Sequence, residues 1–127
     1  VHQNETQRKY YRLAITIPPQ DMIMGRISLV LTNEAICEWE IGWAIHPEEW
    51  GKGYASEAAH SMLDFAFGRL GAHRVIARCH AANKPSVGVM RKLSMQQEGI
   101  LRGIRWWHEN WNDELMYSIL EHEWKNI

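Results

Sequence analysis

A short glycine-rich segment has the composition of a phosphate-binding loop. It reads Trp50-Gly51-Lys52-Gly53-Tyr54-Ala55-Ser56 and lies between an expected strand and an expected helix. Glycines let backbone N–H groups approach phosphate oxygens, and the positive end of the following helix dipole favours the negative charge. Lys52 can add a cation. The competing interpretation is a tight turn whose glycines only permit positive φ angles, and the residues alone leave both open.

Two common nucleotide motifs do not fit this loop. A Walker A loop needs four residues between its glycines and a Ser or Thr after Gly-Lys, which Gly51-Lys52-Gly53 does not supply. A dinucleotide-binding G-x-G-x-x-G motif needs a third glycine where this chain has Ser56. The phosphate ligand is therefore neither of these nucleotide types.

Two carboxylates on one expected strand are candidates for acid–base chemistry. Segment 37–45 alternates large apolar residues with small or acidic ones, so Glu38 and Glu40 point to the same sheet face. We expect helices to cover that face, and a carboxylate buried there can act as a general base. The alternative is a structural carboxylate paired with a nearby arginine or backbone donor.

The histidines and tryptophans have simpler explanations. No H-x-x-x-H or Cys/His ligand spacing links the histidines, so we predict no metal site; the histidines considered are His46, His60, His73, His80 and His108. The run Trp106-Trp107-His108 and Trp111 can line an acceptor pocket. Cross-strand aromatic pairs that stabilise a hairpin account for the same residues.

Alternating strands and helices would position these groups. We expect strands at 10–16, 24–31, 37–45, 74–80, 97–106 and 113–120, and helices at 54–70 and 83–93. Pro18-Pro19 ends the first strand, Gly71 stops the first helix, and Pro85 fits the first turn of the second. The order predicts an α/β (α+β) fold, with a mixed central sheet flanked by helices.

The composition fits one compact soluble domain over residues 1–127. Hydrophobic residues make up 46% of the 127, and the formal net charge is −1, which argues against nucleic acid or an anionic membrane as partner. We expect no signal peptide in the polar N-terminal segment and no membrane helix, because no apolar run has the length that one needs. Cys37 and Cys79 are expected to be reduced, and we predict a cytoplasmic protein.

Two motifs in order resemble the acetyl-CoA signature of the GNAT superfamily of N-acetyltransferases. The first runs from Glu40-Ile41-Gly42-Trp43 through His46-Pro47 to the glycine loop, where Trp50 replaces the first residue of the general motif Q/R-x-x-G-x-G/A. The second is Asn83-Lys84-Pro85-Ser86 followed by Met90-Arg91-Lys92-Leu93. The resemblance covers residues 22–124 and is nearest to the branch that acetylates the N-terminal alanine or serine of ribosomal proteins.

The resemblance implies the GNAT acyl-CoA N-acyltransferase fold and direct acetyl transfer from acetyl-CoA, without a metal, to a primary amine of a peptide N-terminus or a small molecule. It implies that the segment from Trp50 to Ser56 binds the pyrophosphate, and that the strand end near Ile45 pairs with the pantetheine arm. It implies that the Ser86 hydroxyl lies near the sulfur of acetyl-CoA and that Asn83 contacts the cofactor. Glu40 stands at the position where some distant members have their general base. Asn83 and Ser86 are also ordinary helix caps, and a base acting through water is the alternative to Glu40.

The chain departs from the family pattern in two places. Ser94-Met95 stands where Gly-Phe is usual, which changes a helix stop and a packing residue. The first strand and the early helices of the fold are expected to be absent, and that region builds part of the acceptor site. The alternatives are therefore a catalytically silent acyl-CoA-binding module and a domain whose open sheet edge forms a homodimer.

Overall fold

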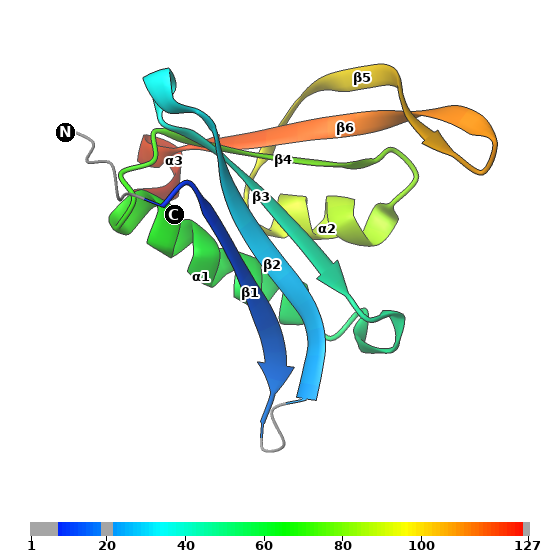
Figure 1. Cartoon of the computed structure of the whole chain (residues 1–127), viewed down its shortest axis with the longest axis horizontal. Helices are drawn as coiled ribbons and strands as arrows, with labels where there is room; N and C mark the ends of the chain where they lie inside the picture. The colour runs from blue at the N-terminus through cyan, green and yellow to red at the C-terminus, as the bar shows by residue number, and fades with distance from the viewer. Residues whose placement is uncertain (1–7, 19–21, 126–127) are drawn as a thin grey trace.

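A computed structural model describes residues 8–18 and 22–125 (Figure 1). Within them the chain forms a six-stranded sheet, helices and two 3-10 turns. The elements are β1 (Tyr10–Ile17), β2 (Met22–Asn33), η1 (Glu34–Ile36), β3 (Glu38–Ile45), η2 (Pro47–Glu49), α1 (Tyr54–Gly68), β4 (Arg74–His80), α2 (Lys84–Lys92), β5 (Gln96–Trp107), β6 (Asn110–Leu120) and α3 (Glu121–Lys125). The expected order of strands and helices is confirmed.

The sheet is mixed, as expected, and its centre opens into a gap. The strand order is β1-β2-β3-β4-β6-β5, with β3 and β4 parallel and the other neighbours antiparallel. β3 and β4 pair only from Glu38 opposite Arg74 to Glu40 opposite Ile76. Figure 1 shows the two strands diverging beyond that point. The edge of β3 that faces the gap therefore has backbone groups without a partner strand.

Helices α1 and α2 pack on the same face of the sheet (Figure 1). Trp39 and Ile41 of β3 point to this face and join a core with Leu63 of α1 and Met90 of α2. Glu38 and Glu40 alternate with these residues and lie on the opposite face. The expectation that helices cover the two carboxylates is therefore wrong, because both crossover connections place their helices on one side.

The ends of elements differ from the sequence prediction in places where local turns intervene. Cys37 is not in the strand but at a left-handed turn, with φ 50°, between η1 and β3. Gly71 does stop α1: its φ is 68°, and the N–H of Ala72 donates to the carbonyl of Ala66. The short helix α3 was not expected, and it is held by Trp124, whose indole donates to Asp64 and stacks on Phe67.

Three properties of the described residues limit the chemistry. No helix among them is long and apolar enough to cross a membrane. Nor do three His, Cys, Asp or Glu side chains among them gather as a metal site would require. Both cysteines are free thiols, and burial, with a smaller effect of Glu114, raises the pKa of the Cys79 thiol. Cys79 therefore stays protonated and unreactive at neutral pH.

An ion pair across the sheet makes stability depend on pH. Arg74 bonds Glu38 at 2.6 Å and also bonds Glu98. The bond that Glu98 accepts from Arg74, followed by the one that it accepts from Ser118, lowers the pKa of the Glu98 carboxyl below 4.5. A lowered pKa stabilises the fold above about pH 4.5, and the contribution is lost as the pH falls through the folded-state pKa. We expect Glu98→Gln to flatten the acid side of a urea-unfolding pH profile. Glu109→Gln, at the exposed hairpin tip, should leave the profile unchanged.

Candidate active site

One cavity lies where β3 ends, against the glycine loop and the starts of α1 and α2. Its volume is about 760 Å³. The cavity is lined by Trp43, Ala44, Ile45, Glu49, Trp50, Gly51, Gly53, Tyr54, Ala55, Ser56, Asn83, Pro85, Ser86, Gly88, Val89 and Lys92. Most of the residues chosen from the sequence thus come together here, from segments far apart in the chain. Lys52 and Glu40 are not in the lining.

The loop has the geometry of an anion-binding turn. Gly51 and Gly53 have φ angles of 79° and 83°, and a Cβ added to either would meet no atom within 4 Å. Gly53 is the N-cap of the 15-residue helix α1 and makes no side-chain cap bond. The N–H groups of the first turn of α1 therefore remain available at the positive end of the helix dipole. The two glycines allow the backbone conformation that a phosphate needs, and they leave space for its oxygens.

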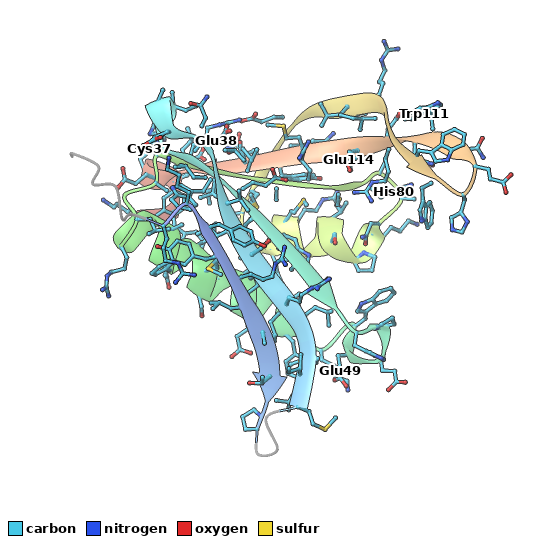
Figure 2. The ribbon with its side chains drawn as sticks, in the orientation of Figure 1. Cys37, Glu38, Glu49, His80, Trp111 and Glu114 are labelled. Atoms are coloured by element: carbon cyan, nitrogen blue, oxygen red, sulfur yellow. The ribbon has the colours of Figure 1, made fainter. Side chains whose placement is uncertain are left out.

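The lysine of the loop does not point freely into the cavity. The Lys52 ammonium bonds the Glu49 carboxylate at 3.0 Å, and this bond raises the pKa of Lys52. Glu49 itself lines the cavity at the lower end of β3 in Figure 2. A phosphate bound to the loop must therefore compete with a carboxylate for Lys52.

Removing that carboxylate should strengthen phosphate binding. In Glu49→Gln we expect the acetyl-CoA that the resemblance implies to bind about two- to fivefold more tightly, because the Lys52 ammonium is then free to contact its phosphates. Glu48→Gln, one residue earlier and outside the cavity lining, serves as the matched control. Isothermal titration at low salt measures both, and a weaker affinity in Glu49→Gln would show that the pair holds the loop in its binding shape.

Hydrogen bonds fix the groups at the inner end of the cavity. The indole N–H of Trp43 donates to Ser86 Oγ at 3.3 Å, which joins β3 to α2. Asn83 Oδ1 accepts from the backbone N–H of Ser86 at 3.1 Å, so Asn83 is the N-cap of α2, as its cap interpretation predicts. The indole of Trp50 donates to the Ile45 carbonyl at 2.9 Å. This bond uses one of the two lone pairs of the Ile45 carbonyl oxygen.

Glu40 lies outside the cavity and is bound by an arginine. Both of its carboxylate oxygens accept from Arg78, at 3.1 and 3.4 Å. This contact agrees with the structural-carboxylate interpretation. Trp43 and Glu49 were missed by the sequence reasoning, since each looked like an ordinary strand or loop residue. The available signals were the place of Trp43 in the first motif and the position of Glu49 next to the glycine loop.

The aromatic cluster stabilises the β5–β6 hairpin. Trp106 and Trp111 pair across the strands with ring centroids 5.2 Å apart, and Trp107 packs against His80 at 4.9 Å. Figure 2 shows Trp111 far from Glu49 and the loop. None of these tryptophans lines the cavity, and they are 52–64% exposed. Cross-strand pairing therefore accounts for the Trp106–Trp111 pair.

The cavity lies where a parallel pair of strands opens beside a glycine loop and a helix N-terminus. Comparison with known proteins identifies the family of this chain. Residues 1–96 match the family model described as an acetyltransferase (GNAT) domain. The chain belongs to the GNAT acetyltransferase family. The GNAT fold expected from the resemblance is confirmed.

This GNAT chain is similar to several bacterial proteins. It is 45% identical to the uncharacterized N-acetyltransferase YnaD of Bacillus subtilis over 68% of this chain, and 31% identical to N-acetyltransferase p20 of Bacillus licheniformis over 89%. A solved GNAT acetyltransferase from Bacillus anthracis superposes with a TM-score of 0.79 at 35% identity, over 91% of this chain and 68% of that one. The chain spans 51% of YnaD and 64% of p20.

Proposed function

We propose that this chain is the donor-binding part of an enzyme that transfers the acetyl group of acetyl-CoA to a primary amine. The observation that carries the proposal is the cavity: a glycine loop at a helix N-terminus lies beside an unpaired edge of β3. A pyrophosphate suits the first, and an extended pantetheine arm suits the second, because its amides can pair with free strand groups. Acetyl-CoA contains both in one molecule.

The chain's own residues supply binding, orientation and a proton. The loop from Gly51 to Ser56 holds phosphate through backbone N–H groups, and the β3 edge near Ile45 orients the thioester at the gap. Because Ser86 Oγ already accepts the Trp43 N–H, its own hydroxyl hydrogen is left to donate. Ser86 can therefore give a proton to the thiolate that leaves as the amine nitrogen bonds to the acetyl carbon. Asn83 orders this helix start.

Among the described residues, the carboxylate in the cavity lining is that of Glu49, and it is bonded to Lys52. Glu40 is held by Arg78, so we propose that water carries the proton from the amine and that Glu40 is structural. The acceptor class remains a further proposal. The motif letters favour the ribosomal N-terminal branch, and one relative, YdaF of Bacillus subtilis, has ribosomal N-acetylation in its name at 29% identity.

Thermal unfolding with acetyl-CoA, CoA, ATP and NAD in parallel tests the donor. A ligand that binds the folded state raises the midpoint by mass action, by about 2.7 kcal/mol of stability at a concentration 100 times Kd. We expect a shift with acetyl-CoA and CoA and none with ATP or NAD. No shift with either CoA species contradicts the proposal. A shift without turnover of any amine points to a silent acyl-CoA-binding module.

Replacing Ser86 should reduce turnover more than binding. A thiol has a pKa near 8.5, so its thiolate leaves without much help, and we expect Ser86→Ala to lower kcat about tenfold at pH 7, below the usual 10²–10⁴ of proton transfer. KM for acetyl-CoA should change little. Ser61→Ala, on the exposed face of α1, is the control. An unchanged kcat in Ser86→Ala leaves the hydroxyl a helix-start residue without a catalytic role.

A further inference from the structure

A second hollow lies on the sheet face opposite α1 and α2. It has a volume of about 450 Å³ and is lined by Arg12, Arg26, Ile27, Ser28, Gly42, Trp43 and Ala44. The register sets Arg12 opposite Ser28, and Ser28 opposite Gly42. The floor is low because its side chains are small: a Cβ added to Gly42 would lie 3.1 Å from Ser28 Oγ. Two arginines therefore flank a polar depression.

This hollow adjoins the same strand segment as the acetyl-CoA cavity. Trp43 and Ala44 line both the cavity and the hollow, and these two spaces lie on opposite sides of β3. The segment lies beyond Glu40, where β3 no longer pairs with β4. With the acyl donor occupying the helix side, an amine reaches the gap from the opposite face. The hollow lies on that approach.

The two arginines differ from the others on this face. Arg74 bonds Glu38 and Glu98, Arg78 bonds Glu40, and Arg105 bonds Glu114. Over residues 8–18 and 22–125, no carboxylate lies within 4.0 Å of the Arg12 or Arg26 guanidinium, although Arg12 lies 5.1 Å from the centre of the Tyr10 ring. The neighbouring Glu40 is occupied by Arg78. The hollow therefore carries positive charge that its described neighbours do not balance.

We propose that Arg12 and Arg26 bind a carboxylate of the acceptor, so that the acceptor is an amino-carboxylic acid, and neither a polyamine nor the protein N-terminus that the motif letters favour. A guanidinium holds a carboxylate through two parallel N–H···O bonds, and the Ser28 hydroxyl between the two arginines can add a third donor. The same charge repels a polycation. This inference rests on the proposed acetyl transfer and names its substrate class.

A series of ω-amino acids and their carboxamides tests the subsite and measures its distance from the gap. The acids H₂N–(CH₂)ₙ–CO₂H, with n from about 1 to 5, each have a neutral amide of the same shape. Calorimetric titration into the full chain saturated with CoA gives affinity, and acetyl transfer from acetyl-CoA gives kcat/KM. We expect the best acid to exceed its amide about tenfold in both, as one charge-assisted contact allows. Spermidine should bind more weakly than that acid.

Variants locate the effect. Arg26→Gln and Arg12→Gln should each bring the acid toward its amide, whereas Arg69→Gln, at the exposed end of α1, should keep the tenfold preference. A free tripeptide and its C-terminal amide, titrated in the same way, distinguish a peptide carboxylate from that of a free amino acid.

The outcomes separate this inference from the proposed function. If acid and amide bind equally, if spermidine binds better, or if no acceptor binds, the anion subsite is wrong, while stabilisation by acetyl-CoA and turnover of any amine keep the proposed function. If acetyl-CoA does not bind, the proposed function fails and this inference fails with it. If Arg12→Gln and Arg26→Gln each keep the preference for acids over amides, the two arginines do not bind the carboxylate and the anion subsite is wrong.

Discussion

Gly53→Asp is expected to weaken acetyl-CoA binding by about 100-fold or more, which corresponds to about 2.7 kcal/mol. The new carboxylate would stand at the N-cap of α1, beside the phosphate oxygens that the loop is proposed to hold. Like charges about 4 Å apart repel by about 4 kcal/mol at an effective dielectric constant of about 20. The fold should survive with some loss of stability: a Cβ here meets open space, but the φ of 83° is a left-handed conformation that Asp adopts with strain. Isothermal titration with acetyl-CoA measures the loss.

Gly53→Asn is the matched control for charge. Asn has the shape of Asp, tolerates the left-handed backbone that φ 83° requires, and is neutral. We expect it to bind acetyl-CoA at least about tenfold more tightly than Gly53→Asp, with equal unfolding midpoints in the absence of ligand. Equal loss in the two variants would mean that backbone strain or bulk decides binding, and that the loop does not hold a negative charge.

The sequence was sufficient for the parts of the site that depend on local pattern. Gly51 and Gly53 stand between a strand of period two and a helix with an apolar stripe, so their position at a helix N-terminus followed directly. Asn83-Lys84-Pro85 marked the start of α2 because a cap residue and a first-turn proline are chemically distinctive. Both motifs then meet in one cavity, as parallel strands joined by helices require.

Other features depend on which face a helix covers, and no local pattern shows that. The alternation of β3 put Glu38 and Glu40 on one face, yet two successive crossovers laid α1 and α2 on the other. The partners Arg74 and Arg78 come from a strand more than thirty residues away. The Lys52–Glu49 bond is a rotamer choice on a loop, which the letters leave undetermined. These tertiary contacts decide which charges are free for chemistry.

Leu63→Ala should produce the largest loss of stability, about 2–5 kcal/mol. Leu63 is fully buried in α1, within the core that includes Trp39 and Ile41 of β3. Its truncation removes apolar contacts and leaves a cavity that close-packed neighbours fill only in part. Because α1 has the glycine loop at its N-terminus, the thermal unfolding midpoint of the variant should also be lower than that of the unsubstituted chain at every concentration of acetyl-CoA. Urea unfolding measures the free energy.

Leu13→Ala makes the same chemical change where little is buried. Leu13 lies on the edge strand β1 and is 52% exposed, so we expect a loss within about 0.5 kcal/mol. The contrast separates packing from the intrinsic difference between leucine and alanine. If the two variants lost equal stability, α1 would not be held on the sheet by this core, and the position of the glycine loop at the end of β3 would need another cause. A large loss confined to Leu63→Ala ties the geometry of the candidate site to the helix face that covers it.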